Sequence, residues 1–477
     1  MQKPKFDKDL LPHPIYEGNS EFVNLYWKAW KFAWNHVLTN GNAPQSPYID
    51  EALNENIIWI WDTCFMALYC RYGFRLFPSV ESLNNFYFPL HEGIKSPLKI
   101  QHVDNPPLFA WVEYENFKLT GDTERLKWLL LEKKFLQRHY NFIENCKRYH
   151  LKKAGRVFTF ARKREYGFQW KGVASGMDNT PRGRGNANRN MLWLDLLAQQ
   201  GLSAKYIMLM ANILGESSIY TKYETKYQEI SKLLDQYYWN DEEGIYYDIH
   251  RKTPEQQIKV KTPATYWPML AEMCKPSQAE RLAAKVQDSN CFGGIPPWPS
   301  VSRDDPDFNP QGEYWRGGIW LPMAYMGTKA LEKYGFFREA RQTSINLLIH
   351  MLKTFQEYEP HTIWEVYSPT EVKPATYKDN KQVYRPEFCG WSALGPISLF
   401  IENIIGIYEI NAYHKQIKWN LQEEGRHGLI NLQFGDINTD LIYDKREILV
   451  NSNKPYTLTV NSKDFEIQSG EQLFKIS

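Results

Sequence analysis

Residues 169–185 read QWKGVASGMDNTPRGRG, and the rest of the sequence is organised around this stretch. Pro181 keeps the preceding residues out of a helix, and the glycines of this stretch permit positive φ angles. We therefore expect Asp178 to lie on a rigid turn rather than on the face of a helix. The turn places this carboxylate close to the cation of Arg182 and shortly after Trp170, an aromatic side chain that we expect to be exposed.

Asp178 has two structural explanations and one chemical explanation. It can cap the helix that is predicted to begin near Asn186, or it can pair with an internal arginine such as Arg182 or Arg184. The chemical explanation rests on a second carboxylate in a similar setting, Glu365 in the segment IWEVY. Two such carboxylates are typical of glycosidases, so the sequence indicates this class of enzyme beside the two structural explanations.

The composition is that of a globular protein with a large core. The chain has 477 residues, of which 43% are hydrophobic and 23% charged, and it contains 17 Trp, 30 Tyr and 25 Phe. Aromatic rings often form the floor of sugar-binding pockets, because the apolar faces of pyranose rings stack on them. A large aromatic core explains the same count, so the composition agrees with a carbohydrate site without requiring one.

The charges are balanced, with 57 Lys and Arg against 55 Asp and Glu, which argues against a nucleic acid or an anionic membrane as partner. A neutral small-molecule carbohydrate fits this balance. The six cysteines show neither the spacing of metal ligands nor a short disulfide framework, and we expect no metal and no cofactor. The first residues lack an apolar signal segment, so we expect a soluble protein, cytoplasmic as given, and periplasmic or secreted if a signal peptide has been removed. The oligomeric state stays open.

Hydrophobic residues recur at spacings of three and four along much of the chain, which predicts many amphipathic helices. Asp62 ends a nearly apolar run and begins one of these helices, so it either caps that helix or binds sugar hydroxyls. The segment 291–313 is rich in Pro, Gly and Asp, and ordered loops of this length are usually functional. The predicted helices are 21–39, 62–73, 106–121, 122–146, 188–213, 220–239, one ending near 334, 337–357 and 388–410, with a hairpin at 239–248.

From about residue 425 the pattern changes to alternation, which predicts short β-strands. Roughly a dozen helices in pairs, with long loops and no βαβ rhythm, favour a ring of helical hairpins. We expect an extended lead-in at 1–20, a helical catalytic ring at 21–424 and a small β-rich segment at 425–477.

Seven short motifs resemble those of glycoside hydrolase family 63, in the branch of glucosidases and mannosylglycerate hydrolases, and more distantly those of trehalases. They occur in the order of that family across roughly residues 55–410, which makes their combination more specific than any single motif. The motifs are Trp61-Asp62, Gln101, SGMDNTPR at 175–182, PSVSRDDP at 299–306, YWRG at 314–317, Trp364-Glu365 and GWS at 390–392.

The resemblance implies an all-α fold, an (α/α)6 toroid of six helical hairpins, here followed by the small C-terminal β appendage. It implies that Asp178 is the general acid and Glu365 the general base. Two positions depart from the family pattern, since Val366 stands where Asn usually follows the base and Gly318 stands where Pro usually follows Arg-Gly. The candidate sugar-binding residues are Trp59, Asp62, Gln101, Trp170, Arg182, Tyr314, Trp315, Arg316 and Trp391.

The residues by themselves would assign the two roles in the opposite way. Arg182 or Arg184 would stabilise an ionised Asp178 if it pointed inward, whereas aromatic neighbours would desolvate Glu365 and favour its protonated form. We follow the resemblance, because the sequence does not fix where the arginines point.

The function expected from these residues is that of an exo-acting, inverting α-glycoside hydrolase that releases a terminal sugar, glucose or mannose. Tryptophans that converge inside a ring predict a pocket closed at one end. Loops that meet at one mouth can hold the two carboxyl groups far enough apart for a water, about 6.5 to 9.5 Å in inverting enzymes.

Three alternatives belong to other classes. A catalytically silent carbohydrate-binding protein on the same fold is favoured by Val366. A terpenoid-type enzyme would need an aspartate-rich metal motif on a helix, but Asp304 and Asp305 stand in a proline-containing loop. A lyase or a phosphorolytic enzyme is the third alternative, and a phosphate requirement would reveal the latter. The sequence shows no nucleotide-binding glycine motif, zinc-type His pair or Ser-His-Asp elbow.

Overall fold

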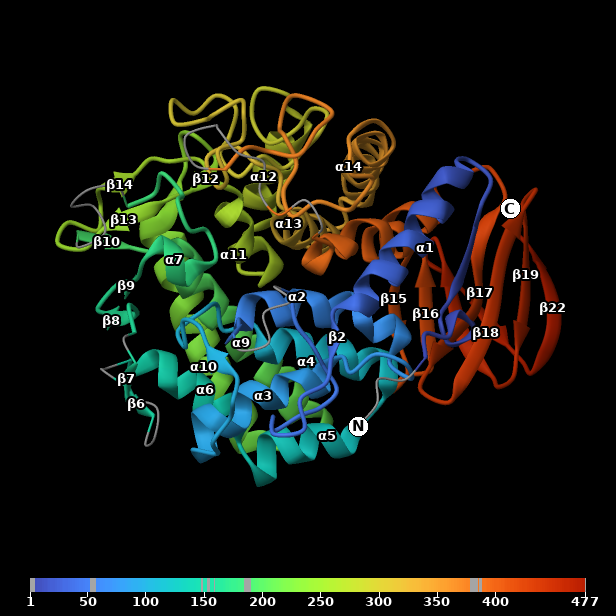
Figure 1. The fold of residues 1–477 in the computed structure, drawn as a ribbon, viewed down its shortest axis with the longest axis horizontal. Helices are drawn as coiled ribbons and strands as arrows, with labels where there is room; N and C mark the ends of the chain where they lie inside the picture. The colour runs from blue at the N-terminus through green and yellow to red at the C-terminus, as the bar shows by residue number, and fades with distance from the viewer. Residues whose placement is uncertain are drawn as a thin grey trace.

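The structure is a computed structural model of the chain. Most of the helices form one body, and the C-terminal strands, drawn in red, gather at one side of it (Figure 1). The chain therefore has a mainly helical part and a β region. The structure describes residues 5–51, 57–146, 149–151, 155–157, 159–183, 190–377, 385 and 388–476.

One set of helical segments lies at the centre of the helical part. Helix α2 contacts α4, α4 contacts α9, α9 contacts α11, and α11 contacts α13. Both α13 and α2 contact the 3₁₀ helix η9, which continues directly into η10. Nearly all side chains of these segments are buried, including polar ones such as Glu113, Asp195 and Gln199. The segments are α2 (Ile60–Cys70), α4 (Phe109–Thr120), α9 (Leu194–Ile213), α11 (Trp267–Leu270), α13 (Leu321–Lys333), η9 (Gly390–Leu394) and η10 (Gly395–Ile405).

A second set of helices covers the first set from outside. Helix α10 packs on α9, α14 packs on α13 and η10, and α1 packs on η10. Most of these helices bury one face and expose the other, as their amphipathic sequences require. They are α1 (Ser20–Asn35), α3 (Asn84–Tyr87), α6 (Phe135–Glu144), α10 (Ser217–Leu233), α12 (Pro276–Gln287) and α14 (Phe337–Glu357).

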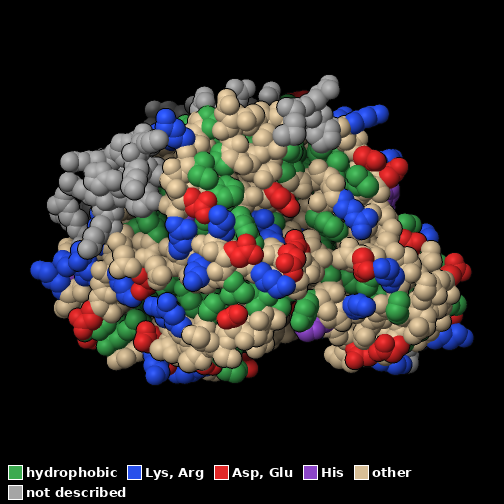
Figure 2. Space-filling model, turned by 90° about the horizontal axis from the view of Figure 1, so that it is seen from below, with side chains coloured by type: hydrophobic (Ala, Val, Ile, Leu, Met, Phe, Trp, Pro, Cys, Tyr) green, Lys and Arg blue, Asp and Glu red, His purple; other side chains and the backbone are tan. Residues whose placement is uncertain are grey.

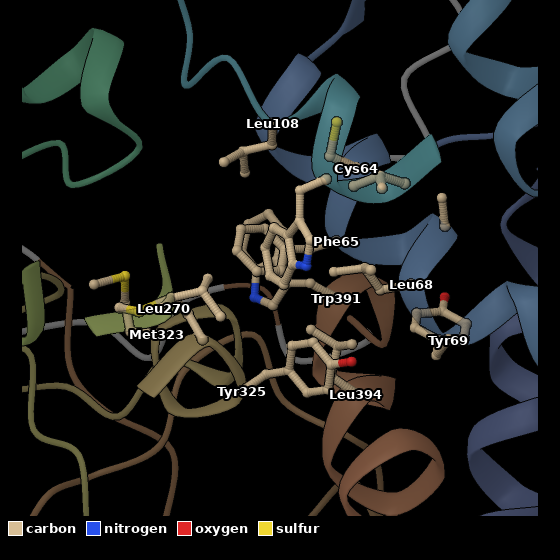
Figure 3. Close-up of a cluster of buried hydrophobic side chains, with 14 of the residues drawn as sticks. Cys64, Phe65, Leu68, Tyr69, Leu108, Leu270, Met323, Tyr325, Trp391 and Leu394 are labelled. Carbon is tan, nitrogen blue, oxygen red and sulfur yellow. The ribbon is translucent and has the colours of Figure 1, made fainter. Parts of the chain in front are cut away.

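The side chains of the central helices meet in one hydrophobic core. Figure 3 shows Phe65 and Leu68 of α2 in one cluster of buried side chains with Trp391 of η9, Tyr325 of α13 and Leu270 of α11. All five side chains are at most 5% exposed. This core fills the middle of the helical part, and Trp391 also lines the cavity described below.

A buried network of charges joins the carboxyl-terminal ends of the central helices. Arg71, directly after α2, binds Glu115 of α4 at 2.7 Å and Glu402 of η10 at 3.0 Å. Glu402 also accepts Lys329 of α13 at 2.7 Å. Each ion has an opposite charge within reach, which offsets the cost of its burial. The network ties these helices together at this end of the helical part.

The β region consists of two sheets that face each other. Aromatic pairs connect them, as between Phe434 and Tyr456, whose ring centroids are 5.5 Å apart. One sheet has the order β1-β17-β18-β19-β22 and the other β15-β16-β20-β21. The strands are β1 (His13–Tyr16), β15 (Ile407–Asn411), β16 (Gln416–Trp419), β17 (His427–Phe434), β18 (Ile437–Asp444), β19 (Glu447–Ser452), β20 (Tyr456–Val460), β21 (Lys463–Ile467) and β22 (Gly470–Lys475).

The β region is larger than the segment expected at 425–477. It begins at Ile407, because Gly406 takes a positive φ of 95° and ends η10 there. The expected lead-in at 1–20 also contributes strand β1, which pairs with β17. Pairing between distant strands is a tertiary property, so alternation in a local window did not reveal these additions.

One predicted helix is interrupted. Residues 122–146 divide into α5 (Thr123–Lys127), the π-type η5 (Trp128–Glu132) and α6, because Lys134 takes a positive φ of 54° before α6 begins. The hairpin predicted at 239–248 is present as the pair β11 and β12. The other short helices are η1 (Lys8–Leu10), η2 (Arg71–Gly73), η3 (Val80–Leu83), η4 (Phe88–Glu92), α7 (Gly172–Ser175), η6 (Leu234–Tyr238) and η7 (Pro263–Tyr266).

Short strand pairs connect the helices at their loops. The strands are β2 (Val37–Leu38), β3 (Tyr48–Ile49), β4 (Ile57–Ile58), β5 (Lys99–Ile100), β6 (Tyr149–Leu151), β7 (Gly155–Val157), β8 (Arg162–Arg164), β9 (Gly167–Gln169), β10 (Met191–Leu192), β11 (Trp239–Asn240), β12 (Ile245–Tyr246), β13 (Asp248–His250) and β14 (Gln257–Ile258).

The visible surface carries both signs of charge. Figure 2 shows one face of the molecule on which Lys and Arg side chains alternate with Asp and Glu, as the balanced composition predicts. Among the helices that the structure describes, none has an apolar stretch long enough to cross a membrane. All six cysteines are buried free thiols.

Candidate active site

A cavity of about 170 Å³ lies at the amino-terminal ends of the central helices. Trp59 and Asp62 come from the start of α2, Asn105 from the loop before α4, and Trp391 from η9. Trp61 of α2 and Val173 of α7 also line the cavity, and loops supply the remaining side chains. The full lining consists of Glu51, Trp59, Trp61, Asp62, His102, Asn105, Val173, Gly176, Asp178, Tyr314, Trp315, Trp320, Glu365, Arg385 and Trp391.

Asp178 lies on a turn at this cavity, as the sequence predicts. The short helix α7 ends at Gly176, and the side chain of Asp178 is exposed. Its neighbour Asn179 fixes the turn, since its amide donates to the carbonyl of Glu313 at 2.9 Å and accepts the backbone N–H of Trp315 at 2.8 Å. These two bonds hold the Asp178 turn against the loop that supplies Tyr314 and Trp315.

Gly176 offers a test of how closely this turn is fixed. Its φ is +82°, and a Cβ at this position would lie 2.8 Å from a ring carbon of Trp61. We expect Gly176→Ala to lower stability by about 1 to 2 kcal/mol from backbone strain and to lower activity by displacing Trp61 or the Asp178 turn.

Gly215→Ala is the matched control for this prediction. Gly215 has a φ of +73° but open space around its Cβ position, so the strain is similar without a clash. Thermal denaturation and initial rates of both variants separate the two effects. Full activity in Gly176→Ala would show that contact with Trp61 does not position the turn.

Glu365 lies at the buried end of the cavity, with 1% of its surface exposed. Trp391 Nε1 and Ser392 Oγ both donate to its backbone carbonyl at 3.3 Å. Its Oε1 accepts the hydroxyl of Tyr314 at 3.5 Å, and its Oε2 lies 3.9 Å from Nε of Arg385. Oε2 is fully buried and accepts no hydrogen bond from any residue that the structure describes.

Several groups set the ionisation of Glu365. Burial raises the pKa of its carboxyl well above the usual range of a glutamate, while the guanidinium of Arg385 acts in the opposite direction. The negative charges of Glu51 and Asp178 raise the pKa further. A group of this kind is ionised only at a pH above its raised pKa.

Aromatic rings form one wall of the cavity. Trp315 and Trp320 stack with ring centroids 4.0 Å apart and an interplanar angle of 5°. Trp391 follows Trp320 at 5.9 Å, and Trp61 meets Trp315 edge to face at 6.3 Å. Rings arranged in this way present apolar faces and edges to a ligand, as the apolar side of a pyranose ring requires.

The structure decides between the two roles that the sequence left for Asp62. Trp59 occupies the cap position of α2, and Asp62 stands in the first turn of the helix, so it is not the cap. Its side chain lines the cavity. Burial, and after it the charge of Glu51, raise the pKa of Asp62 well above its usual value. Glu51 and Asp62 therefore form a pair of carboxyl groups that favours binding at least one proton.

Arg182 lies outside the cavity lining. Its guanidinium binds Asp248 at 2.6 and 2.7 Å and Asp195 at 2.9 and 3.2 Å, and it covers the ring of Trp193. All the charged groups of this cluster are at most 3% exposed. The cluster anchors the Asp178 turn to α9 and β13, which is a structural task. Arg184, the other cation considered beside Asp178, lies outside the described residues.

Three other predicted sugar contacts also lie outside the cavity lining. Trp170 was expected to be exposed, but it is 1% exposed and donates its Nε1 to the carbonyl of Asp104 at 3.1 Å. Gln101 uses its backbone N–H to continue the pairing of β4 and β5, and its neighbour His102 faces the cavity instead. Arg316 binds Glu313 at 2.9 Å.

Sequence reasoning missed four polar residues of the cavity. Glu51 stands alone in an unremarkable loop sequence, and Arg385 lies in a polar stretch without periodicity. His102 and Asn105 flank the motif residue Gln101 but carry no spacing signal. A buried acid next to a strand, as in YIDE at 48–51, is the one local feature that could have indicated Glu51.

The two departures from the family pattern are neighbours in space. A Cβ on Gly318 would lie 2.6 Å from Cγ2 of Val366, so Val366 fills the space that a larger residue at 318 would need. Val366 is fully buried and does not line the cavity. The departures therefore lie in contact with each other behind the cavity lining.

Comparisons with known proteins agree with this chemistry. The family model described as the mannosylglycerate hydrolase MGH1-like glycoside hydrolase domain matches residues 93–379. This range contains Asp178 and Glu365 and covers more than half of the chain.

Two curated relatives extend the comparison. An uncharacterized protein of Borreliella burgdorferi is 26% identical over 480 residues, which cover 95% of each chain. A probable mannosyl-oligosaccharide glucosidase of Schizosaccharomyces pombe is 26% identical over 256 residues, which cover 50% of this chain and 30% of the glucosidase. The matched part thus spans less than a third of that enzyme.

A solved structure shows the same fold. The GH63 mannosylglycerate hydrolase from Thermus thermophilus, in complex with glucose, superposes with a TM-score of 0.59 at 18% sequence identity. The superposition covers 78% of this chain and 99% of that enzyme.

Proposed function

Since the chain belongs to the mannosylglycerate hydrolase MGH1-like glycoside hydrolase family, we propose that it hydrolyses an α-glycoside and releases the terminal sugar with inversion of configuration. The sugar is glucose, with mannose as the alternative. The observation that carries the proposal is that Asp178 and Glu365, 187 positions apart in sequence (365 minus 178), line the same cavity with an aromatic wall.

In this proposal the helical part is an (α/α)6 toroid. The closed series of contacts from α2 through α4, α9, α11 and α13 to η9 and η10 supports a ring of inner helices, and the helices outside it supply a second ring. Loops before the inner helices then meet at one mouth, where the cavity lies.

Asp178 acts as the general acid and Glu365 as the general base. Asp178 is exposed at the cavity, and a bound sugar would remove water from it, which favours the protonated form that an acid needs. Glu365 lies deep at the cavity, and its carboxylate deprotonates a water on the opposite face of the sugar. The pyranose ring stacks on the wall that contains Trp315 and Trp391.

The enzyme acts on chain ends in this proposal. The hydrophobic core around Trp391 and the charge network of Arg71, Glu115, Glu402 and Lys329 fill the far end of the helical part. A substrate can then enter from one side only, so a single non-reducing sugar fits beyond the scissile bond.

A panel of substrates tests the proposal. The chain is incubated with α-linked glucose and mannose disaccharides, with mannosylglycerate and with a longer α-glucan oligosaccharide. We expect turnover of at least one of them, single sugars as the first products, and the β-anomer first in proton NMR spectra. An initial α-product would refute inversion, early internal fragments would refute exo action, and sugar binding without turnover would favour a carbohydrate-binding protein.

A further inference from the structure

Arg385 is the cation that reaches the buried carboxylate of Glu365. Its Nη1 forms an ion pair with Oε1 of Glu51, and its Nη2 donates to the backbone carbonyl of Glu51 at 3.4 Å. Its Nε faces Oε2 of Glu365 at 3.9 Å. The guanidinium also lies over the ring of Phe388, 4.7 Å from the centroid. Contacts with Glu51, Glu365 and Phe388 therefore fix the side chain of Arg385, although it is 28% exposed.

The geometry divides the guanidinium between two acids. Glu51 binds Nη1 and Nη2 of Arg385. Nε of Arg385 lies 3.9 Å from Oε2 of Glu365, which is too far for a hydrogen bond. The positive charge thus acts on Glu365 from 3.9 Å, and Oε2 accepts no hydrogen bond from the described residues. A direct hydrogen bond from Arg385 would occupy that oxygen.

We propose that Arg385, held in place by Glu51, is the positioning residue that favours the ionised form of Glu365 against the effect of its burial. The inference rests on the proposed function, in which Glu365 is the base. Arg385 acts through Glu365 and takes no part in bond making.

The groups that face Glu365 act in both directions. Negative charge on Glu51 and Asp178 disfavours the ionised form of Glu365. Asp62 interacts with Glu51, and each of these two carboxyl groups affects the protonation of the other. The contact from Tyr314 and the charge of Arg385 favour the ionised form. Arg385 supplies the full positive charge among these groups, which all lie in the described part of the chain.

Two substitutions move the ionisation of Glu365 in opposite directions. Arg385→Gln removes the cation, which raises the pKa of Glu365, so the acidic limb of the kcat/KM profile should move to higher pH by about one unit or more. Glu51→Gln removes a negative neighbour and releases Arg385 toward Glu365, so the same limb should move to lower pH. Arg385→Lys keeps the charge and should restore part of the wild-type profile.

The measurements are pH profiles of kcat and KM, with melting temperatures to confirm folding. Arg281→Gln is the matched control, since Arg281 is a surface arginine remote from the cavity lining, and its profile should stay unchanged. A lower kcat with an unmoved limb would assign Arg385 a merely structural role and overturn the proposal. A higher KM with an unmoved limb would make it a substrate contact and overturn the proposal equally.

A titration without substrate separates this inference from the proposed function. The side-chain carboxyl carbons of glutamate are labelled with ¹³C, and the Glu365 signal is identified by its loss in Glu365→Gln. We expect this signal to titrate at higher pH in Arg385→Gln than in wild type, whether or not a substrate has been found. Identical titrations would overturn the role of Arg385, whereas lack of turnover by the wild type would contradict only the proposed function.

Discussion

Replacing Asp178 by Asn, or Glu365 by Gln, is expected to lower kcat roughly 100-fold to 10,000-fold, because each change removes one partner of proton transfer. Both replacements keep the size and shape of the side chain, and Asp178 is exposed, so the fold should be retained. Glu365→Gln removes a buried ionisable group and should leave the melting temperature unchanged or higher.

A substrate with a good leaving group distinguishes the two roles. An α-glycosyl fluoride needs no proton on its leaving group, so Asp178→Asn should recover much of its turnover on this substrate. Glu365→Gln should stay inactive, because the attacking water still needs a base. If Glu365→Gln instead recovered turnover on the fluoride, Glu365 would be the acid and Asp178 the base. This is the assignment that the neighbouring residues favour when the family resemblance is set aside.

Two exposed carboxylates provide controls for these variants. The side chain of Asp241 is 94% exposed and that of Glu359 is 78% exposed, and neither lines the cavity. Asp241→Asn and Glu359→Gln should therefore leave kcat unchanged. A near wild-type kcat in Asp178→Asn or Glu365→Gln with an unchanged melting temperature would remove that residue from the mechanism.

Replacing Arg182 by Met is expected to destabilise the protein by about 3 to 5 kcal/mol, because it leaves Asp195 and Asp248 buried without their cation. The same guanidinium anchors the turn of Asp178, so activity should also fall. Chemical denaturation and initial rates measure the two effects. Adding Asp195→Asn and Asp248→Asn to Arg182→Met should restore part of the stability, since the uncompensated buried charges are then removed.

This prediction also separates an anchor from a sugar contact. Arg426→Met is the control, because the ion pair of Arg426 with Glu17 is exposed and should contribute about 1 kcal/mol or less. If Arg182→Met raised KM while stability stayed at the wild-type value, Arg182 would contact the substrate as the family resemblance implied.

The local sequence was sufficient where backbone geometry decides the structure. Gly176 and Pro181 restrict the chain around Asp178 to a turn, and the structure has that turn. The helix predicted at 337–357 has the bounds of α14, whereas the helices predicted at 21–39 and 220–239 correspond to α1 and α10, which end earlier, at Asn35 and Leu233. The hairpin of β11 and β12 followed from a short acidic turn between aromatic residues.

The sequence was insufficient to predict the orientation of a side chain that could point in either of two directions. Arg182 follows Asp178 by four positions, yet its guanidinium forms ion pairs with Asp195 and Asp248. The sequence gives no sign of these two ion pairs. Trp170 was expected at the surface and is buried against Asp104. Asp248 and Asp104 each lie 66 positions from the side chain that they bind, so local chemistry allowed either direction.

The sequence by itself determined the helical part of the chain and its resemblance to a glycoside hydrolase family, because motif chemistry and periodicity are local properties. Only the tertiary structure decided which side chains share the cavity with Asp178 and Glu365. Glu51 and Arg385 are 334 positions apart (385 minus 51) and meet at Glu365. The electric field at a buried carboxylate depends on such distant charges, and their distances exist only after the chain has folded.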